Sequence, residues 1–263
     1  MDLPIVSAAP IILILLVMSR VLALVSMLPL TGTFSVYDPV KVGLGLFMAL
    51  VVLAFRGVNT DELPHDLLSL TAAMGGEILL GLAMGFTVRV AMEAVNIAGA
   101  MAGFQMGFTI ANVVDPVTGD QVSVIATFQM LAAALIFFMS GLFDGFVEGV
   151  LRSFEIVGPG LAQPGAAAFE SFTAWGAAMF VNSLAIGAPW ILVLLVTKIG
   201  FGLVARTFPQ MNVFFVGFPV TVALGLVIIS IGMPMFYASV ASVLGDTPGQ
   251  FWTLVKASAP GVQ

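Results

Sequence analysis

The sequence of 263 residues is 60% hydrophobic and only 8% charged. Soluble globular domains are about 45–50% apolar and about 25% charged, so this chain has too few polar residues for a water-facing surface. Its formal net charge of −6, with eight Lys and Arg residues spread singly, excludes a basic stripe for nucleic acid. We therefore expect an integral membrane protein surrounded by lipid or other protein, with room for five or six spanning segments.

Residue types that carry catalysis or bind metals are scarce. The absence of cysteine excludes disulfides, thiolate metal sites, iron–sulfur clusters and a Cys nucleophile. The only histidine, His65, lies in a polar stretch without a partner motif, and we interpret it as a structural loop residue. No cofactor and no metal are expected. Because no cation precedes Arg20, we expect the first apolar run to be retained rather than cleaved, with the N-terminus outside the cytoplasm.

The first half of the chain predicts long apolar helices. Residues 5–28 predict one helix interrupted by Arg20. Residues 42–55 are too few to cross a bilayer as a straight helix, and we interpret them as buried in protein. After a polar connector, residues 67–110 are long enough for two helices or one bent helix.

The second half continues with two more apolar blocks. Residues 122–143 predict a spanning segment, followed by an acidic, glycine- and proline-rich stretch that we interpret as the longest non-spanning connector. Residues 172–197 predict a helix that contains Pro189. The uncharged block 211–244 is divided by Pro219, Gly225, Gly232 and Pro234 and predicts a helical hairpin or a broken helix, since prolines remove backbone donors that lipid cannot replace.

Glycines recur four residues apart in three places. This spacing puts them on one helix face, where they allow two backbones to approach closely. Packing within the chain and packing at a subunit interface explain the pattern equally well. The residues are Gly81 and Gly85; Gly99, Gly103 and Gly107; and Gly141, Gly145 and Gly149.

Three charged residues, Glu77, Arg89 and Glu93, lie within apolar sequence. An ionised side chain costs at least about 2.5–3.5 kcal/mol at the centre of a membrane helix, so these residues should face protein or water. Arg89 and Glu93 are four residues apart, and we interpret them as a structural ion pair rather than a proton relay. Glu77 has no cation at helical spacing and is a candidate for an intersubunit contact.

The segment 96–129 combines a small, flexible glycine-rich stretch with a polar turn. Asp115 and Pro116 suit the first two positions of a type I turn, and Asp120 or Ser123 can cap the helix that follows. A polar turn between apolar helices is often a surface connector. Because irregular backbone survives at membrane depth only in protein or along a cavity, the alternative is a loop that lines a passage.

At this segment the sequence resembles the FliR family, the export-gate subunit of flagellar type III secretion. Two separated motifs in the expected order carry the resemblance, and a third short match precedes them. The matching residues are Ala98, Gly99, Gln105, Met106, Gly107, Asp115, Pro116, Gly119 and Phe128; Arg206, Pro209, Gln210, Met211, Asn212, Val213, Phe214, Gly217, Phe218 and Pro219; and Glu77, Leu80 and Gly81.

The resemblance implies an all-α membrane protein that is one copy in a gate with several FliP-like and FliQ-like subunits. Residues 1–171 would form a FliP-like part, residues 172–250 a FliQ-like helical hairpin, and residues 251–263 a tail of one integral membrane domain. Such a chain closes a spiral of subunits in the bacterial inner membrane, at the flagellar basal body. FlhB-like and FlhA-like export components and unfolded flagellar proteins are the further expected partners.

The resemblance also implies a gate loop at residues 106–115, which would protrude into the central passage and shut it to ions. Its apolar tips would be Phe108, Ile110, Val113 and Val114, completed by methionines of the partners, since Met can mould around an unfolded chain. Gln105, Met106, Asp115, Pro116 and Gly119 belong to the same site. Arg206, Gln210 and Asn212 are expected to hold the hairpin turn or a neighbouring subunit.

We therefore interpret the chain as a non-enzymatic subunit of the flagellar export gate. Its main rival is a small-solute secondary transporter with broken helices around Pro189, Pro219 and Pro234. The equivalent gate subunit of a virulence injectisome is a further alternative. An intramembrane protease or other hydrolase is disfavoured because no motif contains the histidine.

Overall fold

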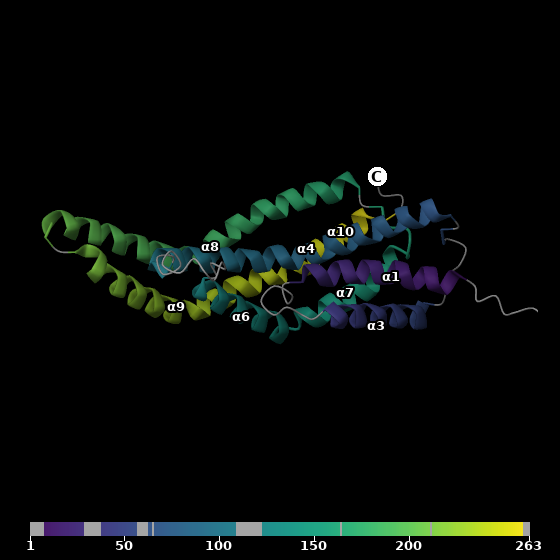
Figure 1. The fold of residues 1–263 in the computed structure, drawn as a ribbon, viewed down its shortest axis with the longest axis horizontal. Coiled ribbons are helices and arrows are strands. Elements are labelled where there is room, and N and C mark those ends of the chain that lie inside the picture. The colour runs from purple at the N-terminus through teal and green to yellow at the C-terminus, as the bar shows by residue number, and fades with distance from the viewer. Residues whose placement is uncertain are drawn as a thin grey trace, which may run out of the picture. The chain divides into compact units, whose positions relative to one another are not determined.

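In the computed structural model, the described residues are 8–28, 38–56, 63–64, 66–108, 123–163, 165–210 and 212–259. Within these ranges the regular elements are all helices, as the composition predicts (Figure 1). Four helices are long and apolar enough to cross a membrane, and α6 and α7 add a fifth if that broken pair forms one span. The helices are α1 (Ala8–Met27), α3 (Asp38–Arg56), α4 (Leu67–Met106), α6 (Val124–Met139), α7 (Leu142–Ile156), α8 (Ala166–Thr207), α9 (Val213–Gly245) and α10 (Thr247–Ala257).

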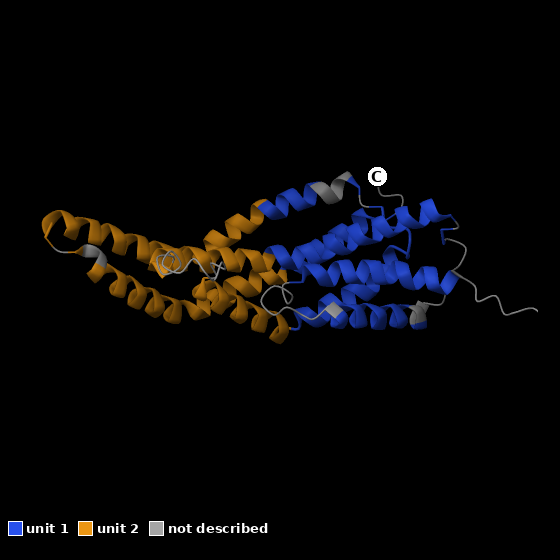
Figure 2. Ribbon diagram, in the orientation of Figure 1, with its two compact units in different colours: residues 1–90, 141–176, 246–263 blue, residues 91–140, 177–245 orange. Residues whose placement is uncertain are grey.

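The chain divides into two compact units, each built from separate stretches of sequence (Figure 2). Unit 1 contains residues 1–90, 141–176 and 246–263, and unit 2 contains residues 91–140 and 177–245. Helices α4 and α8 contribute residues to both units. The division of the chain into a FliP-like and a FliQ-like part stays a prediction.

In unit 1, α1 packs against α3 and against the first part of α4. Gly81 and Gly85 of α4 lie directly under α1, where a Cβ on Gly81 would overlap the carbonyl oxygen of Arg20 and one on Gly85 would lie 2.6 Å from that of Leu24. The absence of side chains at these two positions therefore allows backbone-to-backbone packing in apolar surroundings.

Aromatic side chains hold the other helices of unit 1 together. The ring of Phe172 at the start of α8 packs edge-on to Phe86 of α4, with centroids 5.0 Å apart. Phe251 of α10 packs against Phe146 of α7 at 5.8 Å, beside Gly149. Edge-to-face pairs of this kind add to the burial of apolar area.

In unit 2, α4 is tightly packed against α6 and α8 against α9. A Cβ on Gly99 would lie 2.5 Å from Cα of Ala126, and one on Gly103 would overlap the hydroxyl oxygen of Ser123. That hydroxyl caps α6 by accepting a hydrogen bond from the Ala126 N–H at 3.4 Å. Helices α8 and α9 contact each other in unit 2, where the rings of Trp190 and Phe236 have centroids 6.2 Å apart.

Several helices differ from the expected boundaries. Residues 67–106 form one continuous helix, so the alternative of two helices is wrong. Its charged side chains are accommodated by protein contacts and do not break it. The short run 42–55 belongs to α3, which extends to Arg56 and is only half covered: Met48, Ala49 and Val52 are buried, whereas Phe47 and Leu50 are exposed.

The acidic part of the expected non-spanning connector, after residue 143, is helical and belongs to α7. Phe146, Val150 and Phe154 are buried at intervals of four residues, while Glu148 and Arg152 on the opposite face are exposed and form an ion pair. The preceding spanning segment is shorter than expected, since α6 ends at Met139 and the chain turns at Gly141, which has a positive φ of 72°.

Within the uncharged block, residues 213–244 all belong to the single helix α9, so the expected division into a hairpin or a broken helix is wrong. Pro219 and Pro234 lie inside α9, just as Pro189 lies inside α8. Each proline removes one backbone donor, but leaving the helix would expose many unpaired backbone groups to an apolar medium. The helix therefore continues through them.

Candidate functional site

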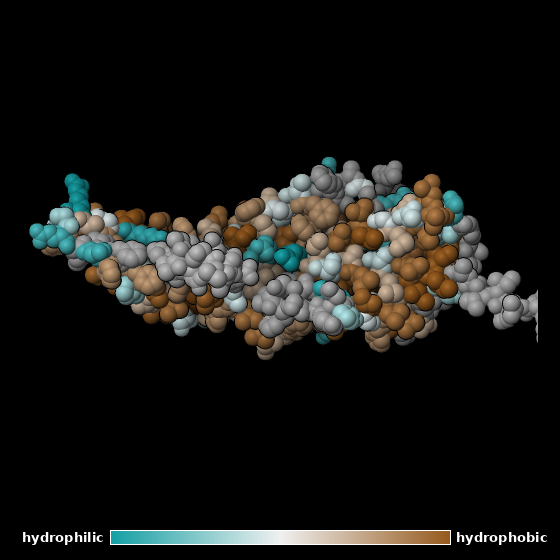
Figure 3. Space-filling view, in the orientation of Figure 1, coloured by the Kyte–Doolittle hydropathy of each residue, from teal (hydrophilic) through white to brown (hydrophobic). Residues whose placement is uncertain are grey.

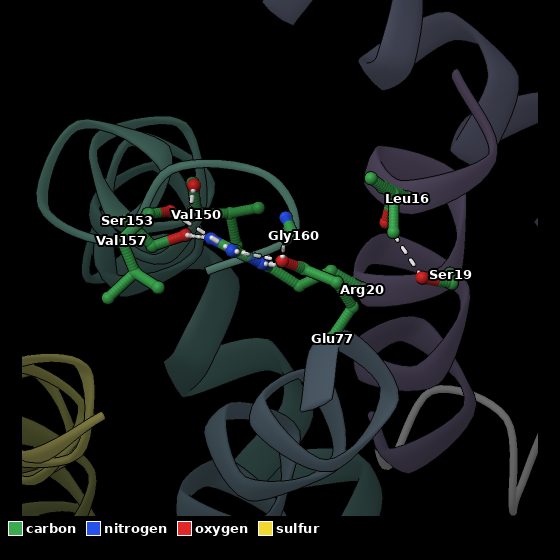
Figure 4. A network of polar contacts seen from close by, with 8 residues as sticks. All are labelled: Leu16, Ser19, Arg20, Glu77, Val150, Ser153, Val157 and Gly160. Carbon is green, nitrogen blue, oxygen red and sulfur yellow. Dashed lines mark hydrogen bonds and ion pairs between the residues drawn. The ribbon is translucent and has the colours of Figure 1, made fainter. Parts of the chain in front are cut away.

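A buried ion pair joins Arg20 of α1 and Glu77 of α4 within unit 1 (Figure 4). Both side chains are 0% exposed. The guanidinium donates from Nε to Oε2 of Glu77 at 2.5 Å and from Nη2 to Oε1 at 3.0 Å. This two-bond geometry is the strong form of an Arg–carboxylate contact.

The same two side chains also hold the end of α7 and the turn behind it. Arg20 donates from Nη2 to the carbonyl oxygen of Val157 at 3.0 Å and from Nη1 to the hydroxyl of Ser153 at 3.2 Å. Glu77 accepts the Gly160 N–H at 2.7 Å (Figure 4). The guanidinium carbon lies 4.1 Å from the ring centre of Phe154, a cation–π contact.

The network gives Glu77 a partner in its own chain, where the sequence analysis favours a neighbouring subunit. Sequence spacing could not identify Arg20 because it lies on another helix, far from Glu77 in the chain. One indication was present in the sequence: Arg20 is a lone cation inside an apolar helix, and such a residue needs a polar partner. Because their hydrogen bonds are directed at each other and at α7, these groups act as a structural clamp.

The other expected pair, Arg89 and Glu93, lies on α4, with both side chains half-buried. Glu93 accepts a hydrogen bond from the side-chain amide of Asn96 at 2.8 Å. An ion pair between Arg89 and Glu93 stays a prediction.

The end of α4 is a second place where polar groups and close packing meet. Met106, the last residue of the helix, is fully buried, and its carbonyl oxygen accepts a hydrogen bond from the Thr221 hydroxyl at 3.2 Å. Gly107 follows with a φ of 91° beside the ring of Phe218. Lys198 of α8 lies 5.6 Å from the ring centre of Phe104, where a cation also suits the negative end of the helix.

This end of α4 is where the expected gate loop begins, but most of that loop lies outside the described residues. Gln105, Met106 and Phe108 are described, and Phe108 is half-buried. The residues of the prediction that fall outside are Ile110, Val113, Val114, Asp115, Pro116 and Gly119. His65, the loop histidine, also falls outside.

The expected packing glycines fall into two groups. Gly81, Gly85, Gly99, Gly103 and Gly107 each lie against another part of the chain. Gly141 and Gly145 have no atom of the described structure within 4 Å of a Cβ position, so a packing role for these two glycines stays a prediction.

Arg206 lies in the last turn of α8, Gln210 and Asn212 lie between α8 and α9, and all three are exposed. That they hold the hairpin turn or a neighbouring subunit stays a prediction. Among the described residues no three His, Asp or Glu side chains gather as a metal site would require.

Together, the long apolar helices, the buried Arg–Glu clamp and the glycine-mediated packing define an all-helical integral membrane protein. Residues 11–247 match the family of bacterial export proteins, family 1. The chain belongs to this family.

Similar proteins are known from several bacteria. The flagellar biosynthetic protein FliR of Bacillus subtilis (strain 168) is 32% identical over 239 residues, 89% of this chain and 90% of that protein. FliR of Escherichia coli (strain K12) is 32% identical over 216 residues, 82% of each chain. The Yop proteins translocation protein T of Yersinia pestis is 25% identical over 215 residues, 78% of this chain and 80% of that protein. The expected FliR-family membership is confirmed.

Proposed function

We propose that this chain lines and helps to close the passage through which unfolded flagellar proteins leave the bacterial cytoplasm. Family and fold make it an inner-membrane subunit of a type III secretion export gate of the flagellar kind. Its relatives are proteins of export and flagellar biosynthesis. The role that we propose is structural and conductive, not enzymatic.

The length of the uncharged helix α9 carries the proposal. This helix has 33 residues, none of them charged, and therefore extends about 50 Å, whereas the hydrocarbon core is about 30 Å thick. To fit, it would need a tilt of more than about 50°, outside the usual range of about 0–40°. Part of α9 therefore lies outside the hydrocarbon core, where an apolar surface needs a protein cover.

Exposed apolar side chains on this helix agree with such a cover. Phe215, Val227 and Ile231 are exposed in the single chain. Among the described residues on the face in view, apolar residues occupy most of the surface (Figure 3). Helices α4 and α8, with 40 and 42 residues, are longer still. A chain with this surface suits an assembly of several subunits better than an isolated place in lipid.

The partners that we propose are FliP-like and FliQ-like subunits, with FlhB-like and FlhA-like components of the same export apparatus. In this arrangement the part up to residue 171 packs as a FliP-like subunit would, and residues 172–250 pack as a FliQ-like hairpin. Gly141, Gly145, Arg206, Gln210 and Asn212 would then contact neighbouring subunits.

The segment that follows α4 is proposed as the gate loop. Deletion of residues 109–114, or replacement of Ile110, Val113 and Val114 by serine, should leave the assembly intact but raise ion leakage and reduce flagellin secretion. Leakage is measured as dye or ion flux in cells that express the gate, and assembly by co-purification. Unchanged permeability in both variants would remove the gating role.

A transporter of small solutes is the main alternative, and an assay of the purified chain in liposomes tests it. Purified protein in liposomes should move no small solute without its partners. Solute uptake by the isolated chain would favour the transporter. The Yersinia relative favours a second alternative, export through an injectisome, and secretion assays with flagellar and injectisome substrates would separate these two systems.

A further inference from the structure

One face of α9 receives the end of α4. Phe218, Thr221 and Gly225 are three and four residues apart, so they share a side of the helix. We propose that these residues, here called the α4 socket, are positioning residues that fix where and in which direction the chain leaves α4. The functional consequence rests on the proposed gate loop, which begins at that point.

Gly225 forms the hole of the socket. A Cβ on Gly225 would lie 2.6 Å from both Cγ and Sδ of Met106 and 2.7 Å from its Cε. The Met106 side chain therefore occupies the space that any other residue at position 225 would fill. Because a thioether is flexible, alanine at position 225 should be partly accommodated, whereas a leucine should displace Met106.

Thr221 holds the backbone of the same residue. Its hydroxyl lies 3.2 Å from the carbonyl oxygen of Met106 and 3.0 Å from that of Phe218, so its single proton can bond either oxygen. The last carbonyl groups of a helix have no partner within that helix. Thr221, which is buried, supplies one to the final residue of α4.

Phe218 sets the direction in which the chain continues. Gly107 adopts a φ of 91°, and its N–H donates to the carbonyl oxygen of Phe104 at 3.2 Å. A Cβ on Gly107 would lie 3.1 Å from the Phe218 ring. A left-handed glycine is the usual residue just after a helix end, and here the Phe218 ring fills the side on which a larger residue would need room.

The three residues of the socket contact different groups at the end of α4. Gly225 faces the Met106 side chain, Thr221 donates to its carbonyl oxygen, and Phe218 lies beside Gly107. They come from a helix more than a hundred positions later in the sequence, so the start of the proposed gate loop is fixed by tertiary contacts and not by α4 alone. A displaced Met106 should therefore move the loop without unfolding the helices.

A swap of the large and the small residue tests the socket. Gly225→Leu should raise ion leakage several-fold and reduce secretion while the chain still co-purifies with the gate. The double variant Met106→Ala/Gly225→Leu should restore both toward wild type, because leucine then fills the space of the thioether. Gly232→Leu is the matched control on the same helix, since no described atom lies within 4 Å of a Cβ there.

If Gly225→Leu does not accumulate, Thr221→Val and Thr221→Ser decide the matter. Valine keeps the shape but loses the bond to Met106, so leakage should rise, whereas serine keeps the hydroxyl and should behave as wild type. Equal permeability of both variants would overturn the proposal.

The contact itself can be measured without reference to function. The chain has no cysteine, so Met106→Cys/Gly225→Cys is the only thiol pair in it. Oxidation of membranes should join the two, read as loss of two maleimide-polyethylene glycol mobility shifts. Failure to cross-link would overturn the socket.

The proposed gate loop and the socket fail in different ways. If deletion of residues 109–114 causes leakage but neither Gly225→Leu nor Thr221→Val does, the socket is wrong and the gate loop stands. If the deletion causes no leakage although the cysteines cross-link, the gate loop is wrong and the contact stands.

Discussion

Arg20 and Glu77 form a clamp whose two ends are not equivalent. Arg20 donates to the carbonyl oxygen of Val157, and Glu77 accepts the N–H of Gly160. The surrounding backbone therefore requires a donor on α1 and an acceptor on α4, in addition to opposite charges. Removal of one member leaves the other as a buried charge without compensation, which typically costs about 3–5 kcal/mol.

Exchange of the two residues should not restore stability. In Arg20→Glu/Glu77→Arg the carboxylate would face the Val157 carbonyl and the guanidinium would face the Gly160 N–H, so like groups would meet. Arg20→Ala, Glu77→Ala and the exchange should all lower the thermal midpoint of the purified protein by on the order of 10 °C. Full recovery in the exchange variant would contradict this account.

Arg152→Ala is the matched control for the clamp. Arg152 pairs with Glu148 on the exposed face of α7, with both side chains about 60% exposed. Such surface pairs contribute about 0–1 kcal/mol. The midpoint should therefore change by only a few degrees.

Replacement of the buried residue Gln129 by methionine should not destabilise the protein, in contrast to replacement of Arg20 or Glu77. The Gln129 side chain is 1% exposed, and neither polar atom of its amide has a hydrogen-bond partner among the described residues. Because an unsatisfied buried polar group costs about 1–3 kcal/mol, Gln129→Met should be neutral or stabilising in thermal unfolding. Gln129→Glu, which buries a charge, should be destabilising. A clear loss of stability in Gln129→Met would mean that the amide has a polar partner.

The contacts of individual residues were the least predictable feature of the structure. A charged residue in apolar sequence predicts that a polar partner exists but does not identify it. The partner of Glu77 is Arg20, which lies on another helix. Gly225 was expected only as one of the breaks in the block 211–244, because its packing role depends on the end of α4. These contacts are tertiary and leave no local spacing to read.

Among the helices, α4 has some glycines that pack against another helix and one, Gly75, with no described atom near its Cβ position. Gly81→Ala should destabilise the fold by about 1–3 kcal/mol, because the added methyl would overlap the Arg20 carbonyl and force α1 away. Gly75→Ala on the same helix has no described atom within 4 Å and should stabilise by up to about 1 kcal/mol through helix propensity. The thermal midpoints of the two variants test these expectations. Equal midpoints would rule out the contact between Gly81 and the Arg20 backbone.

The helices themselves were largely predictable, while their ends were not. Apolar runs marked α1, α4, α8 and α9, since a membrane helix is read from its composition. The continuation of α9 through Pro219 and Pro234 was not predicted. A proline weakens a helix only locally, whereas an apolar medium disfavours unpaired backbone groups along the whole of a non-helical segment. The amphipathic α7 was missed because its acidic residues were given more weight than its buried phenylalanines.

At the scale of the whole molecule, the exposed apolar surface should be covered by other proteins. A photo-reactive amino acid at Phe215 or Ile231 of α9 should give adducts with another protein in secreting cells. Val240, which is buried on the same helix, is the control and should react only within the chain. Adducts with lipid alone at both exposed positions would argue for a solitary membrane protein.

The most direct test of the assembly is purification of the tagged chain from native membranes in mild detergent, followed by mass measurement of the intact particle. We expect one copy of this chain in a stable particle with several FliP-like and FliQ-like subunits. A stable particle that contains this chain alone, with lipid as its only companion, would contradict the account.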